Sequence, residues 1–204
     1  VAENQTAIGS VTATDADRGD SITFTVSGSE LAITSAGVLS FATAPDYETK
    51  SSYTATVTAS DGTNTTTQSV TVNVTDVNDN SPVFTSDATF SAAENQTAIG
   101  SVTATDADSG DSVTFTVSGS ELSITSAGVL TFATAPDYET KTSYTATVTA
   151  SDGTNTTTQS VTVNVTDVND NSPVFTSDAT FSAAENQTAI GSVTATDADS
   201  GDSV

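Results

Sequence analysis

The 204-residue chain contains no cysteine, histidine, methionine or tryptophan. The lack of cysteine excludes a disulfide framework and a thiolate metal site. Zinc and copper prefer histidine or cysteine ligands, so neither metal is expected. Catalysis finds little support either, because the usual partners of a nucleophile are missing. Paired carboxylates can serve a glycosidase, but metal binding explains the same residues better, and we do not expect an enzyme.

Positive charge is scarce as well. Three Lys and Arg residues face 26 Asp and Glu residues, which gives a net charge of −23 at pH 7. Nucleic acid and anionic membrane surfaces would repel such a chain, whereas cations would be attracted to it. No apolar run approaches the roughly 18 residues that a membrane span needs. We therefore expect cations as partners, and neither nucleic acid nor membrane insertion.

The sequence repeats itself. The same seven residues begin at Glu3, Glu94 and Glu185, which gives a period of 91 residues. This period is too long for a solenoid and has the size of a small domain with its own core. We predict a first repeat at 1–80 without its first strand, a complete repeat at 81–171, and the start of a third at 172–204.

Apolar residues alternate with Thr and Ser within one repeat. Residues 113–117, 144–150 and 161–165 show this period of two, which is typical of strands with one buried face. Shorter strands are expected at 88–93, 100–105, 122–124 and 129–132, with a turn at 126–128. The pattern predicts an all-β fold of tandem seven-stranded antiparallel Greek-key β-sandwiches of the immunoglobulin-like type. The expected core is Val102, Ala104, Phe115, Val117, Leu122, Ile124, Leu130, Phe132, Tyr144, Ala146, Val148, Val161, Val163 and Val165.

Acidic residues gather in short clusters between the strands. In the complete repeat these clusters are Glu94, Asp106 with Asp108, Asp137 with Glu139, Asp152, and residues 167–171. Strand ends meet at the two poles of a sandwich, so we expect Asp106, Asp108 and Asp152 at one pole and the other acids at the opposite pole. Crowded carboxylates are unfavourable without cations. Calcium fits, since it takes six to eight oxygens from carboxylates, Asn side chains and carbonyls. The plain alternative is a solvated acidic surface with Asp at turns.

Residues 76–84 and their copy at 167–175 resemble the inter-repeat signature of cadherins. The early Glu, the Asp-x-Asp, the Asp-x-Glu and the Ala-x-Asp-Gly match that family in order and spacing, and the resemblance covers the whole chain. Near-identical copies rich in Thr and Ser are most similar to the repeats of large bacterial surface adhesins. The resemblance implies cadherin-type sandwiches arranged in a rod, with Ca²⁺ between successive repeats.

The resemblance also implies a ligand set for each joint. The first joint would use Glu3, Asp46, Glu48, Asn78, Asp79, the carbonyls of Val77 and Asn80, and then Asp106, Asp108 and Asp152. The second joint would use Glu94, Asp137, Glu139, Asn169, Asp170, the carbonyls of Val168 and Asn171, and then Asp197 and Asp199. Its last ligand is expected beyond Val204, and Asp15, Asp17 and Asp61 are expected to serve a joint upstream of Val1. The Asn that follows Asp-x-Asp in the family is missing here, and Asp111 or Ser112 stands near its place.

The expected function is that of a calcium-rigidified segment of an extracellular adhesin on a bacterial surface, acting as a spacer or as an adhesion module. Its partners would be calcium ions and the neighbouring repeats of the same chain. Two alternatives stay open. One is a filament subunit assembled with identical chains by strand complementation. The other is a module that binds surface polysaccharide.

Overall fold

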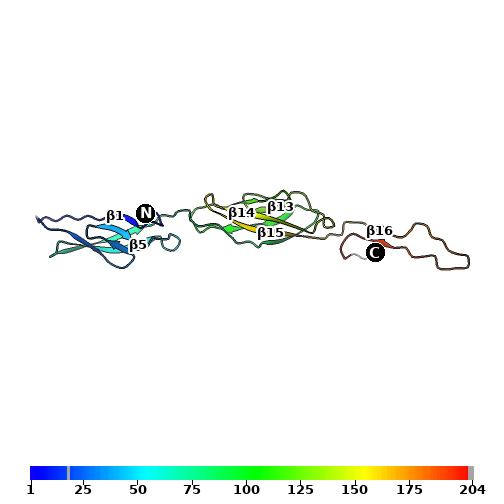
Figure 1. Ribbon diagram of the computed structural model, residues 1–204, viewed down its shortest axis with the longest axis horizontal. Coiled ribbons are helices and arrows are strands. Elements are labelled where there is room, and N and C mark those ends of the chain that lie inside the picture. The colour runs from blue at the N-terminus through cyan, green and yellow to red at the C-terminus, as the bar shows by residue number, and fades with distance from the viewer. Residues whose placement is uncertain (18, 202–204) are drawn as a thin grey trace. The chain divides into compact units, whose positions relative to one another are not determined.

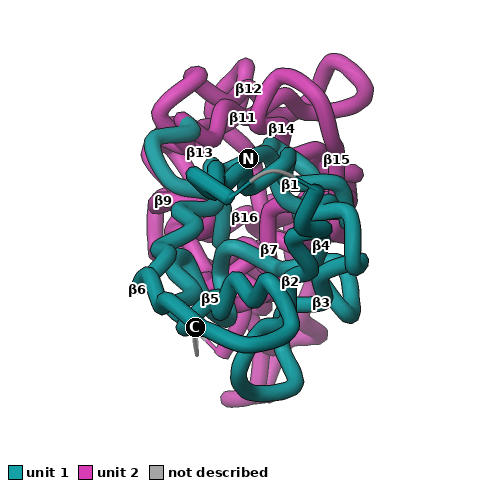
Figure 2. Tube along the Cα trace, turned by 90° about the vertical axis from the view of Figure 1, so that its left-hand side faces the viewer, with its two compact units in different colours: residues 1–80, 107–111 teal, residues 81–106, 112–204 magenta. Residues whose placement is uncertain are grey.

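The computed structural model describes residues 1–17 and 19–201, and its regular elements are all β-strands (Figure 1). The expected all-β fold is confirmed. The chain forms two compact units (Figure 2). The first contains Val1–Asn80 and Ala107–Asp111, and the second contains Ser81–Asp106 and residues 112–201. Over the described residues, no helix has the length and apolarity needed to cross a membrane.

The first unit contains two three-stranded antiparallel sheets. One has the order β1-β4-β3, with β1 at Ala7–Ser10, β4 at Val38–Phe41 and β3 at Leu31–Ile33. The other has the order β2-β5-β6, with β2 at Thr23–Val26, β5 at Ser52–Ser60 and β6 at Thr65–Asn73. Ala2 adds an isolated parallel bridge to Thr75. Buried residues of both sheets, with Val74 directly after β6, form the core: Leu31, Leu39, Phe41, Ala55, Val72 and Val74.

The second unit contains a four-stranded and a three-stranded sheet. The four-stranded sheet has the order β11-β14-β15-β8, with strands Thr114–Val117, Ser143–Ser151, Thr156–Thr166 and Thr89–Ala93. The other has the order β12-β13-β9, with strands Leu122–Ile124, Val129–Phe132 and Ala98–Ser101. Two short pairs complete the unit: β7 (Val83–Phe84) with β10 (Ala104–Thr105), and β16 (Val174–Phe175) with β17 (Ala195–Thr196).

The topology corrects two details of the sequence prediction. The sandwich is not purely antiparallel, because β8 runs parallel to β15. The chain between these strands is long enough for such a pairing, which a tight hairpin could not make. The single strand expected at 100–105 is split into β9 and β10. At the break, the buried Val102 donates its N–H to the Gly128 carbonyl at 2.8 Å, and the chain then leaves β13 to pair with β7.

The core of the second unit follows the alternation of the sequence. Nine of the expected residues are buried: Val102, Phe115, Leu122, Leu130, Phe132, Val148, Val161, Val163 and Val165. Five others are half-buried against them: Ala104, Val117, Ile124, Tyr144 and Ala146. Ala92 and Ala150 are buried in addition. Thr residues between these positions face outward, as in β15, where exposed and buried residues alternate.

Gly128 gives a direct test of this packing. Its φ is 87°, and an added Cβ would lie 2.2 Å from the Val102 carbonyl oxygen. We expect Gly128→Ala to lower the free energy of unfolding by about 3 kcal/mol, because left-handed strain and a backbone clash add up. Urea titration measures the loss. Gly119→Ala is the matched control: φ is 81° there, and nothing lies within 4 Å of the added Cβ. Equal losses in both variants would show that the clash is relieved by a shift of the backbone.

Candidate metal centre

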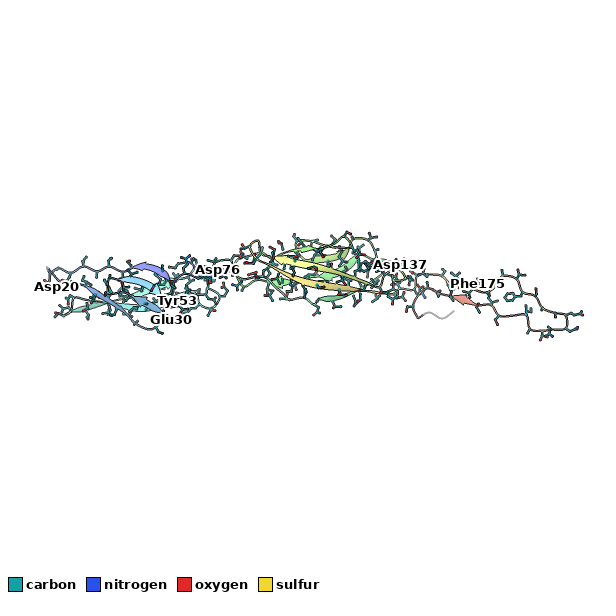
Figure 3. The ribbon with its side chains drawn as sticks, in the orientation of Figure 1. Asp20, Glu30, Tyr53, Asp76, Asp137 and Phe175 are labelled. Atoms are coloured by element: carbon teal, nitrogen blue, oxygen red, sulfur yellow. The ribbon has the colours of Figure 1, made fainter. Side chains whose placement is uncertain are left out.

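Acidic side chains occupy both ends of the first unit, with Asp20 and Asp76 at opposite ends (Figure 3). Near Asp20, carboxylate oxygens of Asp15, Asp17 and Asp20 all lie within 4.8 Å of one another. At the end that carries Asp76, oxygens of Glu3, Asp46 and Glu48 meet the same limit. Oxygens of Glu48, Asp79 and Asp108 form a further group of this kind.

Glu3 lies at the end of the first unit that carries Asp76, and it is only 2% exposed. Its Oε1 accepts a hydrogen bond from the Val77 N–H at 2.8 Å, and its Oε2 accepts one from the Tyr47 N–H at 2.7 Å. Glu94, 3% exposed, holds Val168 and Tyr138 in the same way at 2.8 and 2.7 Å. Each buried glutamate therefore joins the segment after the last long strand to the loop that carries the Asp-x-Glu pair.

The Asp-x-Glu loops are ordered by their own aspartates. Asp46 accepts the N–H and the hydroxyl of Thr49, both at 3.0 Å, and Asp137 does the same with Thr140. Glu48 follows this turn. Partial desolvation, reinforced by the charges of Glu3, Asp76 and Asp108, raises the pKa of Glu48 above its ordinary value. A raised pKa at a carboxylate among other carboxylates indicates a site that a cation would stabilise.

Asparagine side chains orient the other acids. The N–H of Asn80 donates to Asp108 Oδ2 at 2.9 Å and its side-chain amide donates to Oδ1 at 2.8 Å. Asp108 is 5% exposed, and although its sequence belongs to the second repeat, it lies in the first compact unit. Asn171 holds Asp199 with the same two bonds, which lower the pKa of Asp199. Both aspartates are thus held in a defined orientation by two hydrogen bonds each.

The spacing of these oxygens fits calcium. Oxygens bound to one Ca²⁺ at about 2.4 Å lie at most about 4.8 Å apart. The groups of Glu3, Asp46 and Glu48 and of Glu94, Glu139 and Asp167 both satisfy this limit. In addition, Oδ1 of Asp76 and Oδ1 of Asp167 are buried without a hydrogen-bond partner in the described part of the chain. Such orphaned oxygens are unfavourable unless something else binds them, so the residues present suit a hard cation.

Comparison with known proteins identifies the architecture. Residues 78–166 match the family model of a bacterial Ig domain. Among solved structures, mouse cadherin-23 EC22-24 is 28% identical with a TM-score of 0.75, and the alignment covers 98% of this chain and 74% of that one. The repeats are cadherin-like. The resemblance expected from the sequence and the immunoglobulin-like sandwich are both confirmed.

Two further structures are similar to these cadherin-like repeats. The protocadherin gammaB7 EC3-6 cis-dimer structure is 28% identical with a TM-score of 0.76, and the match covers 98% of this chain and 59% of that one. Human CDH23 EC21-23, at 24% identity and a TM-score of 0.73 over 98% of this chain and 81% of that one, shares the fold. No curated protein sequence matches the chain significantly.

Three further acidic residues lie beside the predicted ligands, and the sequence prediction either omits them or leaves their role open. The prediction does not include Asp76 or Asp167, although each opens an Asp-Val-Asn-Asp-Asn string whose later residues are among the predicted ligands. Asp76 Oδ2 accepts a hydrogen bond from the Ser109 N–H, whereas its Oδ1 has no hydrogen-bond partner among the described residues. Asp111, named only as an alternative, accepts a 2.7 Å bond from the side-chain amide of Asn78.

The ligand set predicted for the first joint is divided between the two compact units, because Asp106 and Asp152 lie in the second. Asp152, Asp170 and Asp197 also accept hydrogen bonds from residues near them in the chain. Asp152 Oδ1 accepts the N–H groups of Thr154 and Asn155 at 2.6 and 2.7 Å. Asp197 accepts the Asp199 N–H at 3.1 Å, and Asp170 accepts the Asn171 amide at 2.9 Å. The ligand roles of all these residues stay predictions, and so do those of Asn169 and of the carbonyls of Val77, Asn80, Val168 and Asn171.

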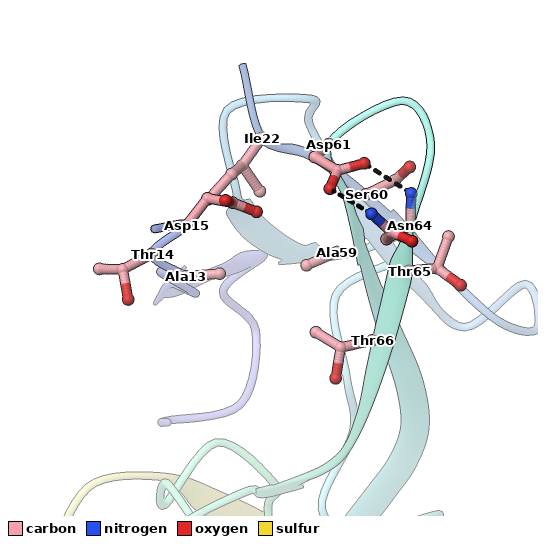
Figure 4. A pocket seen from close by; sticks show the side chains of 10 residues that line it. All are labelled: Ala13, Thr14, Asp15, Ile22, Ala59, Ser60, Asp61, Asn64, Thr65 and Thr66. Carbon is pink, nitrogen blue, oxygen red and sulfur yellow. Dashed lines mark hydrogen bonds between the residues drawn. The ribbon is translucent and has the colours of Figure 1, made fainter. Parts of the chain in front are cut away.

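At the opposite end of the first unit, Asp15 and Asp61 line a cavity of about 140 Å³ (Figure 4). Asp61 Oδ1 accepts the N–H groups of Asn64 and Thr63 at 2.6 and 2.7 Å, which lowers the pKa of Asp61. Asp15 Oδ1 accepts the Asp17 N–H at 2.8 Å. Hydrogen bonds thus orient both carboxylates at the end of the first unit where the sequence predicted ligands of another joint.

Proposed function

We propose that the chain is a calcium-binding repeat segment of an extracellular bacterial adhesin, in which bound calcium stiffens the joints. The observation that carries this proposal is the pair of buried glutamates, Glu3 and Glu94, each of which lies among converging carboxylates. The orphaned oxygens of Asp76 and Asp167 add to it. In this role the segment acts as a spacer or as an adhesion module, without catalysis.

Different residues would have different roles at each joint. Glu3 and Glu94 hold the linker and the Asp-x-Glu loop together through backbone N–H groups. Asn80 and Asn171 orient the aspartates that follow the linker. Bound calcium supplies positive charge that offsets the repulsion among these carboxylates. Because ligands from separate loops share that charge, binding reduces the freedom of the linker and adds stability by linkage.

The extracellular and bacterial parts of the proposal rest on relatives. The bacterial Ig domain match over residues 78–166 favours a bacterial source. Two other similar structures, of protocadherin Gamma B2 and protocadherin GammaB4, are described as extracellular domains. The near-identity of the copies, rich in Thr and Ser, is typical of long surface arrays rather than of a single folded module.

Calorimetric titration with CaCl₂ tests the proposal. We expect saturable binding with dissociation constants of about 10⁻³ M or tighter, as in extracellular calcium modules, and much weaker binding of Mg²⁺, which demands a smaller octahedral site. Asp46→Asn should weaken calcium binding, because Asp46 belongs to the group around Glu3. Asp87→Asn, at an exposed position outside these groups, should leave the titration unchanged.

A flat calcium titration of the unaltered chain would refute the proposed function. Equal binding of Mg²⁺ and Ca²⁺ would also contradict it, since it would indicate simple charge attraction. Small-angle scattering of the same samples tests the stiffening. The range of overall sizes that the chain samples in solution should be narrower with calcium than with chelator.

A further inference from the structure

An asparagine with a left-handed backbone follows the early glutamate in every copy. Asn4, Asn95 and Asn186 have φ of 61°, 62° and 64°, and they are the only described residues other than glycine with positive φ. This conformation costs an ordinary residue about 1–2 kcal/mol, and asparagine tolerates it better than most. The turn recurs at each copy of the same short sequence, which indicates that local sequence sets the backbone.

The turn aims the asparagine side chain at the linker. Asn4 Nδ2 donates a hydrogen bond to Asp79 Oδ2, and Asn95 Nδ2 donates one to Asp170 Oδ2. The second oxygen of each aspartate is held too, because the amides of Asn80 and Asn171 donate to Oδ1 at 3.0 and 2.9 Å. Both carboxylate oxygens of the linker aspartate therefore have a neutral amide donor.

The backbone of the same asparagine reaches the Asp-x-Glu loop. The N–H of Asn4 donates to the Pro45 carbonyl at 3.0 Å, and the N–H of Asn95 donates to the Pro136 carbonyl at 3.0 Å. Both prolines are buried, and each directly precedes the aspartate of its loop. A single residue thus connects the buried glutamate beside it, the Asp-x-Glu loop and the linker aspartate.

The chemistry of this position favours asparagine over other donors. A lysine would bring a positive charge that competes with a bound cation, and an aspartate would add repulsion to a crowded group of acids. A neutral amide orients Asp79 and leaves its charge available. Groups that hold a metal-binding carboxylate in place reduce the ordering that binding requires, and their loss typically weakens metal affinity by about 10–100-fold.

The geometry points to Asn4 and Asn95 as positioning residues that preset Asp79 and Asp170 for a divalent cation. This inference rests on the proposed calcium function. The predicted role is confined to affinity, because both asparagines are exposed and contribute little to the core.

The double variant Asn4→Gly/Asn95→Gly in the whole chain tests the inference. Glycine retains the left-handed backbone and removes only the amide. We expect calorimetry to show a calcium dissociation constant raised at least about tenfold, with a melting temperature in chelator close to that of the control. Gln5→Gly/Gln96→Gly is the matched control. Both glutamines are exposed, and this variant places the same two glycines one residue later in the chain.

A second variant separates positioning from charge. Asn4→Asp/Asn95→Asp tolerates the same backbone but replaces the donor with a carboxylate, and we expect it to weaken calcium binding at least as much as the glycine variant. Calcium affinity equal to that of the control, or tighter binding by the aspartate variant, would overturn the inference. So would a fall of the glycine variant's melting temperature in chelator well below that of the control. A flat titration of the unaltered chain would instead refute the proposed function itself.

Discussion

Removal of calcium by a chelator is expected to lower the midpoint of thermal unfolding by about 10–20 °C. An ion present at 100 times its dissociation constant adds about 2.7 kcal/mol, and each kcal/mol shifts the midpoint of a domain of this size by about 4–8 °C. The reason is the convergence of Glu3, Asp46 and Glu48 within 4.8 Å, which is unfavourable without a cation. Scanning calorimetry of one sample with CaCl₂ and with chelator measures the shift.

Lowering the pH should shift the midpoint of thermal unfolding in opposite directions in the chelator sample and in the calcium sample. The pKa values of Glu48 and Glu139 are raised in the folded chain, mainly by desolvation and further by neighbours that include Glu3 and Glu94. A carboxyl group with a higher pKa in the folded state binds protons more strongly there, so stability in chelator should rise as the pH falls from 7 toward 4.5, the ordinary value for Glu. In calcium, protons compete with the ion for the same oxygens, so the same change should lower the midpoint.

The control for this experiment is NaCl at matched ionic strength in chelator. Sodium ions screen repulsion between exposed charges, but they do not bind several carboxylates at once. NaCl should therefore recover only a small part of the midpoint that chelation removes. A midpoint that is the same in calcium and in chelator, or that NaCl restores completely, would contradict specific calcium binding.

Glu94→Ala is expected to lower the free energy of unfolding of the second unit by about 2–5 kcal/mol, even in chelator. The substitution removes both acceptors of the Tyr138 and Val168 N–H groups from a side chain that is 3% exposed. Each buried donor left without an acceptor costs about 1–3 kcal/mol. Relief of repulsion with Glu139 offsets part of this loss in chelator. Urea titration in chelator measures the change.

Glu121→Ala is the matched control, because Glu121 forms an exposed ion pair with Lys141. Exposed ion pairs contribute about 0–1 kcal/mol, so this variant should unfold close to the unaltered chain. If Glu94→Ala lost stability only when calcium is present, Glu94 would act as a cation ligand alone, and its structural role would be refuted.

Periodicity predicted much of the fold. The strands expected at 122–124 and 129–132 have those bounds in the structure, because their alternation is short and bounded by turns. The parallel pairing of β8 with β15 could not be predicted, since an alternating strand has the same pattern in either direction. The break at Val102 was equally hidden, because it depends on a contact with the distant Gly128.

The site divides in a similar way between sequence and tertiary structure. The sequence alone determined which acids recur at each repeat, because the clusters around Glu94, Asp137 and 167–171 are local strings of residues. Only the tertiary structure decided that Glu94 is buried and bonded to Tyr138 and Val168. It also decided that Asp167 keeps an oxygen without a partner. Burial and hydrogen bonding join residues far apart in the chain, so a local pattern predicts the presence of ligands but not the geometry that holds them.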